Sequence, residues 1–406
     1  MVHGWIAYRI AAGIHQCLPS SRLACLSNAV GGLILAQLKA LGWTDNSTTA
    51  TFSAITTAGM FLGALVGGII GDKTGRRNAF ILYEAIHIAS MVVGAFSPNM
   101  DFLIACRFGM GVGLGALLVT LFAGFTEYMP GRNRGTWSSR VSFIGNWSYP
   151  LCSLIAMGLT PLISAEWNWR VQLLIPAILS LIATALAWRY FPESPRWLES
   201  RGRYQEAEKV MRSIEEGVIR QTGKPLPPVV IADDGKAPQA VPYSALLTGV
   251  LLKRVILGSC VLIAMNVVQY TLINWLPTIF MTQGINLKDS IVLNTMSMFG
   301  APFGIFIAML VMDKIPRKTM GVGLLILIAV LGYIYSLQTS MLLITLIGFF
   351  LITFVYMYVC YASAVYVPEI WPTEAKLRGS GLANAVGRIS GIAAPYAVAV
   401  LLSSYG

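Results

Sequence analysis

The sequence predicts an all-α polytopic membrane protein made of two pseudo-symmetric helical bundles, and three observations lead to this fold class. Hydrophobic residues make up 56% of the 406 residues and charged residues only 12%, whereas a soluble domain is about 45–50% apolar and about 25% charged. Apolar runs of membrane-spanning length alternate with short charged turns. One charged turn occurs twice, once in each half of the chain. A soluble globular domain is therefore excluded.

Apolar runs of suitable length follow one another along the chain. A spanning helix needs about 20 mostly apolar residues. Residues 1–23 fail that test, and the run at 24–41 is a poor first candidate. Clearer spans are expected at 51–70, 79–97, 102–124, 137–163, 171–191, 255–280, 290–312, 319–337, 341–366 and 381–403. We therefore expect about eleven spans.

A polar section at 192–254 divides these spans into two groups. Within it, the charge pattern of 200–221 indicates an amphipathic surface helix. Residues 224–242 are rich in proline and small residues, which is typical of a flexible linker. The expected domains are an N-terminal transmembrane bundle at 1–191, the central section, and a C-terminal bundle at 255–406.

Basic residues mark one side of the predicted membrane. The turns that contain Lys73, Arg134, Arg317 and Arg378 all fall on the same face as the central section. The turns on the opposite side contain few basic residues, and the turn at 98–101 contains none. Short loops rich in Lys and Arg stay in the cytoplasm. The N-terminus and the central section are therefore expected to be cytoplasmic.

The net charge of +11 and the reactive residue types do not indicate another function. A strongly basic soluble protein often binds nucleic acid. Here the basic residues fall mostly in the turns between apolar runs, so membrane topology explains them. No nucleic-acid partner is therefore expected. Six scattered cysteines and three histidines show no metal spacing. No catalytic motif occurs either. We expect no cofactor, no bound metal and no enzymatic activity.

Two charged motifs recur at nearly the same interval. Asp72 is followed four residues later by Arg76, and 241 positions further on Asp313 is followed by Arg317. A second motif contains glutamates that are 242 apart: Glu127 with Arg134, and Glu369 with Arg378. Two landmarks at this interval imply two homologous halves in the same orientation. Parallel repeats of this kind are typical of alternating-access carriers.

Five motifs in order resemble the major facilitator superfamily, in its sugar-porter and metabolite/proton-symporter branch. They are Gly71-Asp72-x-x-Gly75-Arg76-Arg77, Arg107-x-x-x-Gly111-x-Gly113, the two Glu…Arg-Gly loops and Pro192-Glu193-Ser194-Pro195-Arg196-Trp197-Leu198. The resemblance implies the major facilitator fold in a bacterial inner membrane. It also implies a monomer that moves a small polar metabolite, a sugar or organic acid, by alternating access together with protons.

The chain departs from this family at both ends. The family has twelve spans, whereas the eleventh span predicted here closes at the end of the sequence, so we expect the twelfth to be absent. The first span is poor and lacks the acidic residue often found there in proton-coupled members. An alternative function is therefore a non-transporting membrane sensor, or an inactive truncated remnant of such a carrier.

The resemblance implies a cytoplasmic charge network that acts as a gate. Its members are Asp72, Arg76, Glu127, Arg134, Asp313, Arg317, Glu369 and Arg378. Each interfacial ion pair contributes only about 0–1 kcal/mol, but several together can favour the outward-open state. The alternative is that these charges only set topology. Arg107 lies in an apolar run, where a charge costs at least about 2.5–3.5 kcal/mol, and is expected to order this network or tune coupling.

Polar and aromatic residues in the spans indicate a cavity for a small polar solute. The candidates are Asn146, Trp147, Asn266, Gln269, Tyr270, Asn274, Asn294, Asn384 and Arg388. Gln269 and Tyr270 are favoured because sugar-porter relatives place substrate-binding residues on that helix, and they share a face with Asn266. The alternative for each is interhelical hydrogen bonding. Arg388 could meet the carboxylate of an anionic substrate or pair with Glu369.

A second polar pair lies in the span at 79–97. Glu84 and His87 are one helical turn apart, and such a pair could relay protons. Because that span is usually peripheral in this family, a structural role is favoured.

Overall fold

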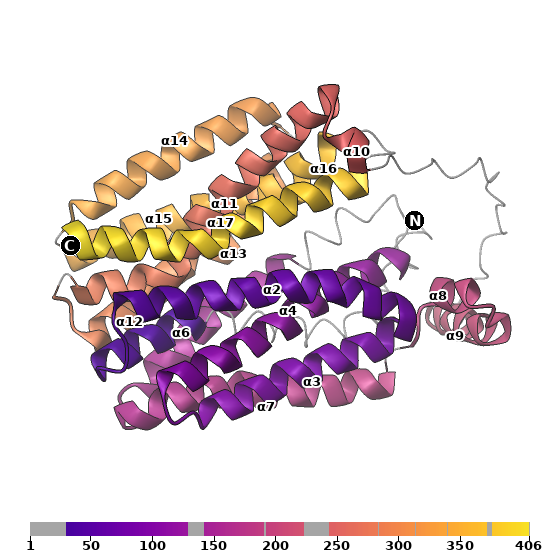
Figure 1. The fold of residues 1–406 in the computed structure, drawn as a ribbon, viewed down its shortest axis with the longest axis horizontal. Helices are drawn as coiled ribbons and strands as arrows, with labels where there is room; N and C mark the ends of the chain where they lie inside the picture. Colours follow the sequence, from indigo (N-terminus) through magenta and orange to yellow (C-terminus); the bar gives the residue numbers. More distant parts are fainter. Residues whose placement is uncertain are drawn as a thin grey trace.

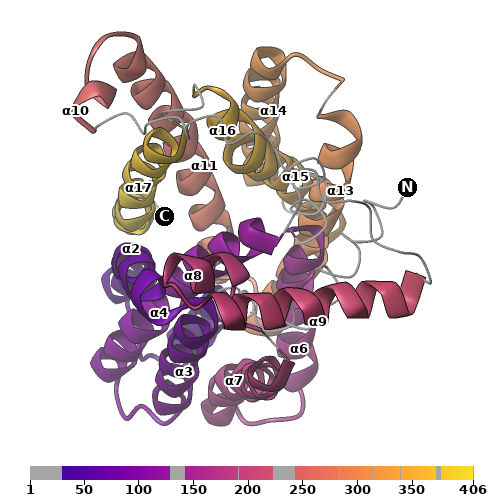
Figure 2. The same ribbon diagram turned by 90° about the vertical axis from the view of Figure 1, so that its right-hand side faces the viewer.

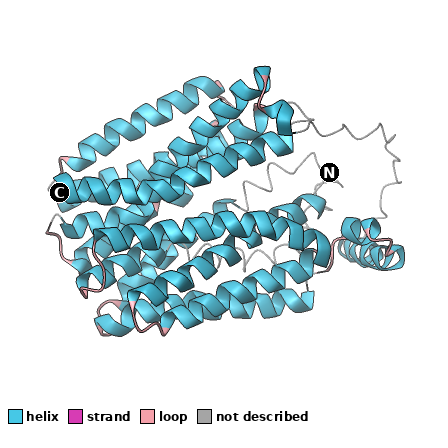
Figure 3. Cartoon of the chain, in the orientation of Figure 1, coloured by secondary structure: helices cyan, strands magenta, loops and turns pink. Residues whose placement is uncertain are grey.

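The computed structural model describes residues 30–128, 142–190, 192–222, 243–282, 284–312, 314–338, 340–371 and 376–405. In these ranges the ordered elements are helices, and no strand occurs among them (Figure 3). Nine of the described helices are long and apolar enough to cross a membrane, and Val30–Ala40 is a shorter apolar helix. A helix lies in each predicted span, although the spans at 24–41, 137–163 and 171–191 extend outside the described residues.

The N-terminal half forms one bundle (indigo to magenta in Figure 1). After the helix Val30–Ala40 its elements are α2 (Asn46–Thr74), α3 (Arg76–Ala95), α4 (Met100–Tyr128), α6 (Ser148–Leu159) and α7 (Ala165–Tyr190). Buried residues of the first helix, including Leu33 and Leu38, share one core with Met91, Leu103 and Trp169. The chain therefore builds its first core from helices that follow each other closely in sequence.

The central section contains three described helices, of which the first two lie outside the bundles and the last buries Leu246 in the core of the C-terminal bundle. They are α8 (Pro195–Ser200), α9 (Tyr204–Thr222) and α10 (Tyr243–Leu246). α9 agrees with the amphipathic helix expected at 200–221, and Figure 2 shows it lying crosswise to the bundle helices. The next helix, α11, begins at Gly249, before the start of the span predicted at 255–280.

The C-terminal half forms the second bundle (orange to yellow in Figure 1). Its elements are α11 (Gly249–Thr282), α12 (Leu287–Met298), α13 (Gly300–Val311), α14 (Arg317–Ser336), α15 (Met341–Cys360), the π-helical segment η2 (Tyr361–Tyr366), α16 (Val367–Glu369) and α17 (Lys376–Tyr405). Its core joins buried residues of α11, α15 and α17, among them Leu262, Val355 and Ala383.

The two bundles use the same close helix packing. A Cβ atom on Gly59 in α2 would lie 2.4 Å from the carbonyl oxygen of Phe108 in α4. A Cβ atom on Gly300 would lie 2.4 Å from the carbonyl oxygen of Phe349 in α15. Each pair is 241 residues from its counterpart, which is the interval of the predicted repeat. Small residues allow backbones in a membrane to approach this closely, and here they do so at matched positions.

The halves meet along several helix pairs, among them α2 with α17 and α6 with α12. A Cβ atom on Gly32 of the first helix would also lie 2.6 Å from the carbonyl oxygen of Ile273 in α11. Asn294 in α12 donates a hydrogen bond of 3.2 Å to Ser153 Oγ in α6, and both side chains are buried. Near the start of α2, Ala50 packs with Trp275 and Ala399 of the other half. In Figure 1 the two bundles diverge toward the end where α8 and α9 lie. The described contacts near the start of α2 therefore join the bundles at the opposite end.

Candidate functional site

A small pocket lies where the two halves meet. Its lining comes from the first helix and from α2, α4 and α11: Gly31, Phe52, Ser53, Thr56, Thr57, Arg107, Tyr270 and Asn274. The bundles around it are mostly apolar, yet six of these eight described lining residues carry hydroxyl, amide or guanidinium groups. Polar groups at membrane depth usually face a cavity or another polar group. Both halves therefore contribute to one polar site.

Arg107 provides the charge in this pocket. Its side chain is buried, and its guanidinium carbon lies 4.4 Å from the centroid of the Phe52 ring, in cation–π geometry. A Cβ atom on Gly31 would lie 3.1 Å from Nη2 of Arg107, so the glycine leaves room for the guanidinium. We expected Arg107 to act with the gate, and the structure places it in the pocket lining.

Two of the predicted substrate-binding residues lie in this lining. They are Tyr270 and Asn274 on α11, and Tyr270 was one of the two favoured positions. The Tyr270 ring lies 3.2 Å from where a Cβ atom on Gly391 would be. Asn266 instead faces Gly387 of α17 and donates its amide hydrogen to the carbonyl oxygen of Leu262.

The other predicted substrate-binding residues lie outside the described lining. Asn294 bonds to Ser153 between the bundles, Asn146 donates to Ser142 O, and exposed Asn384 donates to Ser380 O. The exposed Trp147 packs edge-on against Phe299, with ring centroids 6.3 Å apart. Gln269 and Arg388 are half-buried. Their roles in binding stay predictions.

Sequence reasoning missed the hydroxyl side of the pocket. Ser53, Thr56 and Thr57 occur at helical spacing in α2 and are buried. Thr56 and Thr57 donate to carbonyl oxygens one turn back in their own helix, as hydroxyls in apolar helices usually do. Their recurrence on one helical face was the signal available in the sequence.

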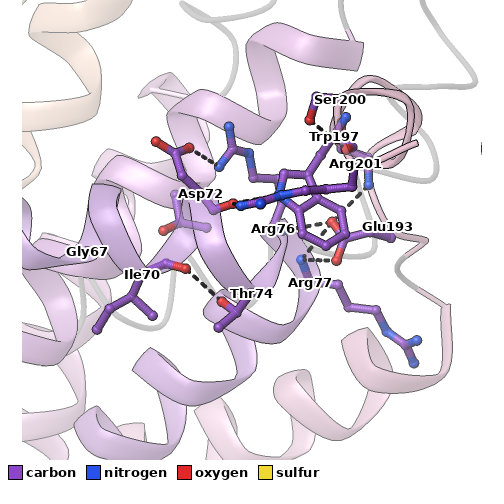
Figure 4. A network of polar contacts seen from close by, with 12 residues as sticks. Gly67, Ile70, Asp72, Thr74, Arg76, Arg77, Glu193, Trp197, Ser200 and Arg201 are labelled. Atoms are coloured by element: carbon purple, nitrogen blue, oxygen red, sulfur yellow. Dashed lines mark hydrogen bonds and ion pairs between the residues drawn. The ribbon is translucent and has the colours of Figure 1, made fainter. Parts of the chain in front are cut away.

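The first half of the predicted gate is a clamp around the turn between α2 and α3 (Figure 4). Asp72 forms an ion pair of 2.7 Å with Arg76 across this turn. The carbonyl oxygen of Asp72 accepts hydrogen bonds of 2.8 Å from Trp197 Nε1 and 2.6 Å from Arg201 Nη2, both on or next to α8. These donors satisfy a carbonyl at the end of α2 that the helix itself leaves open.

Glu193 closes the same turn from the α3 side. Its carboxylate accepts hydrogen bonds from the backbone N–H of Arg76 at 2.7 Å, of Arg77 at 3.3 Å and of Ser194 at 2.9 Å. An acceptor at a helix N-terminus satisfies free N–H groups and the helix dipole. Gly75 is needed here, because its φ is +94° and a Cβ atom would lie 2.3 Å from Glu193 Oε2.

The second half of the predicted gate lies at the matching turn of the C-terminal bundle. Arg317 at the start of α14 makes two contacts with the Glu369 carboxylate, at 3.0 and 3.1 Å. The Tyr361 hydroxyl donates to the carbonyl oxygen of Arg317 at 2.9 Å. This pair therefore ties α14 to α16.

The described gate ion pairs each join residues of one half. Asp72 and Arg76 belong to the first bundle, and Arg317 and Glu369 to the second. Of the remaining predicted gate residues, Arg134 and Asp313 lie outside the described residues, as do the side chains of Glu127 and Arg378. Ion pairs between the halves stay a prediction.

Glu84 and His87 are buried in α3, away from the described pocket lining. Nδ1 of His87 lies 3.0 Å from the carbonyl oxygen of Met110 in α4. Both Glu84 carboxyl oxygens are buried without a hydrogen-bond partner in the described part of the chain. Carboxyl groups inside membrane bundles usually contact other polar groups or take part in proton transfer.

Two helical bundles with a polar pocket between them and charged clamps at one end define a membrane carrier. The sequence profile of the Major Facilitator Superfamily matches residues 20–395, and the chain belongs to this family. The predicted family and fold are thus confirmed.

Known relatives agree with this assignment. The metabolite transport protein YdjK of Escherichia coli (strain K12) is 99% identical over 384 residues, covering 95% of this chain and 84% of YdjK. The inner membrane metabolite transport protein YdjE of the same strain is 44% identical, covering 93% of this chain and 83% of YdjE. The xylose transporter XylE from E. coli, solved in a partially occluded inward-open conformation, has a TM-score of 0.72 at 17% identity, over 96% of this chain and 91% of XylE. The chain is a metabolite transporter of the major facilitator type.

Proposed function

We propose that this protein is a secondary carrier that moves a small polar metabolite, a sugar or an organic acid, by alternating access. The pocket between the halves carries the proposal. Its polar groups come from Ser53, Thr56, Thr57 and Arg107 of one half and from Tyr270 and Asn274 of the other. A solute bound there touches both bundles, so its binding energy changes as the bundles move relative to each other. Such differential binding is what a carrier needs to couple occupancy to conformation.

The described state fits one step of this cycle. Asn294 bonds to Ser153 and Ala50 packs on Ala399, which holds the bundles together away from α8 and α9. Basic residues concentrate at the α8 end, which is the cytoplasmic side by the positive-inside rule. We therefore assign the state as open toward the cytoplasm, with the N-terminus and the central section on that side of the inner membrane.

Proton coupling is the second part of the proposal. One structural neighbour, at 18% identity and a TM-score of 0.70, is described as a D-xylose-proton symporter. In this chain, the carboxyl group of Glu84 is buried and has no hydrogen-bond partner among the described residues, which supports a proton-binding position in α3. Transport together with protons then makes uptake depend on the pH difference across the membrane.

Uptake into proteoliposomes tests both parts. Purified protein is reconstituted, and entry of labelled D-xylose and D-gluconate is measured with and without an acidic exterior. The proposal predicts saturable uptake of a polar solute that the pH gradient accelerates several-fold. If uptake does not depend on the pH gradient, proton coupling is contradicted but transport stands. If the protein binds a solute without transporting it, the sensor alternative is favoured.

Variants of the pocket connect this activity to the site. Asn274→Ala and Tyr270→Phe each remove one polar group from the lining and are expected to weaken binding. Asn78→Ala is the matched control, because Asn78 is exposed on α3, lies outside the described pocket lining, and donates its side-chain amide to the carbonyl oxygen of Thr74. Equal loss in all three variants would contradict the assignment of the pocket.

A further inference from the structure

The charge of the pocket points to the class of substrate. Arg107 places one guanidinium in the lining, and no carboxylate occurs among the eight described lining residues. We propose that the pocket selects anionic metabolites that carry a carboxylate, and that Arg107 is the residue that determines this specificity. This inference rests on the proposed transport function and narrows its substrate from sugars and organic acids to the acids.

Comparison of the two halves shows whether the shared fold requires a charge at the position of Arg107. The contacts of Gly59 with Phe108 and of Gly300 with Phe349 align α4 with α15 at an interval of 241 residues. At this interval the counterpart of Arg107 is Gly348. A Cβ atom on Gly348 would lie 2.5 Å from Ser297 Oγ, so the second bundle has no room for a long side chain there. The shared fold thus forms without a charge at this position.

The geometry around Arg107 favours a carboxylate. The planar guanidinium can donate two parallel hydrogen bonds to a carboxylate, a fit that a hydroxyl group cannot match. Phe52 supports one face of the guanidinium at 4.4 Å, and Gly31 leaves space beside Nη2. The side chain is therefore held by packing, so its donors have a preferred direction.

The remaining lining residues suit the rest of such a solute. The hydroxyl of Ser53 is buried, lines the pocket and has no hydrogen-bond partner in the described part of the chain. Tyr270 and Asn274 present a phenol and an amide from the other half. A carboxylate at Arg107 with polar groups further along the molecule would bond to both bundles at once.

Binding to matched probe pairs tests the proposal. Purified full-length protein in detergent is titrated with D-gluconate against D-glucose and with nicotinate against nicotinamide, so that each pair differs mainly in the carboxylate. We expect at least one acid to bind ten-fold or more tightly than its neutral partner. Arg107→Gln should abolish that ratio by weakening the acid alone, and Arg107→Lys should retain part of it.

The ratio of acid to neutral affinity identifies the role of Arg107, because misfolding weakens both members of a pair. Arg189→Gln, an exposed arginine of α7, is the control and should leave the ratio unchanged. Equal affinities within both pairs, or a ratio unchanged in Arg107→Gln, overturn the inference while solute binding and transport stand. If no probe binds and none is transported, the proposed function fails and the inference with it. Should Arg107→Gln not fold, the wild-type ratios and Arg107→Lys decide.

Discussion

Gly63 in α2 lies so close to Val112 in α4 that a Cβ atom on the glycine would be 2.1 Å from the carbonyl oxygen of the valine. The second bundle repeats this approach, since a Cβ atom on Gly304 would lie 2.1 Å from the carbonyl oxygen of Thr353. Atoms cannot remain at that distance, so a methyl group would push the two helices apart. Close contact between the paired helices is therefore a shared property of the two halves.

Alanine at these glycines should destabilise the protein. Gly63→Ala and Gly304→Ala each force a helix displacement, and overpacking of this kind costs about 1–3 kcal/mol. Thermal unfolding in detergent, followed by a thiol-reactive dye, measures the loss. Gly323→Ala is the control, because nothing lies within 4 Å of a Cβ atom there. A Gly323 variant as unstable as Gly63→Ala would show that the close contact is not the cause.

Replacing Glu193 should loosen the clamp around the turn between α2 and α3. Glu193→Gln keeps one acceptor oxygen but loses the negative charge that faces the N-H groups of Arg76 and Arg77. Hydrogen bonds to charged groups contribute about 1.5–3 kcal/mol, and partial exposure puts the expected loss at about 1–2 kcal/mol. Limited trypsin digestion after Arg196 and Arg201 should become faster. Glu199→Gln, which alters an exposed carboxylate on the helix α8 that follows Glu193, should digest like the wild type.

The Arg317–Glu369 pair should show a measurable coupling energy. A double-mutant cycle with Arg317→Ala and Glu369→Ala, measured by chemical unfolding in detergent, is expected to give about 0.2–1 kcal/mol, because both side chains are partly exposed. The reference cycle uses Arg212 and Glu208, a more exposed pair on α9 at 2.9 Å, where about 0.3–0.5 kcal/mol is expected. If the effects of the two substitutions on the free energy of unfolding are additive, Arg317 and Glu369 have no coupling energy, and the pair does not contribute to the predicted gate.

The cap of α2 should make stability depend on pH in the acid range. Asp45 accepts a hydrogen bond of 2.8 Å from the Thr48 N–H, and the hydrogen bonds from Thr48 hold the pKa of the Asp45 carboxyl below its usual value of 3.8. With a folded-state pKa below the unfolded one, the stabilisation is complete above the usual value and is lost as the pH falls through the folded pKa.

Two substitutions at Asp45 check this sign. Asp45→Ala should cost about 0.5–2 kcal/mol near neutral pH, and its deficit relative to wild type should shrink as the pH falls below about 4. Asn caps a helix as well as Asp does, so Asp45→Asn should keep most of the stability with no such dependence. Melting temperatures at several pH values provide the comparison, and a deficit that grows on acidification would contradict the assigned sign.

Much of the fold could be predicted from the sequence, because it depends on local patterns. Apolar runs locate the helices, and the interval between Asp72 and Asp313 reveals the paired bundles. Tyr270 and Asn274 were identifiable because polar residues stand out in an apolar helix. Arg107 was also visible as a charge in an apolar run, but its direction was not. That direction depends on Phe52 and on the space at Gly31, which lie in other helices.

The role of Glu193 could not be predicted for a related reason. Its motif was recognisable, but its partners are backbone N–H groups more than a hundred residues earlier in the chain. Backbone groups are present at every position, so no sequence pattern indicates which of them a carboxylate will meet. Asn294 was predicted to line the cavity, and in the structure it donates a hydrogen bond to Ser153. Composition alone cannot separate such an interhelical bond from substrate binding, so its role in binding stays a prediction.

The π-helical segment Tyr361–Tyr366 explains a small irregularity in the repeat. Counterparts are 241 residues apart up to Thr353, whereas Glu127 and Glu369 are 242 apart, and α4 has no such segment. A π turn accommodates one more residue than an α turn. In a regular α-helix the added residue would rotate Glu369 by about 100° around the axis, away from Arg317. The wider π turn accommodates the extra residue without this rotation. An ungapped alignment of the two halves would therefore be out of register by one residue beyond Tyr366.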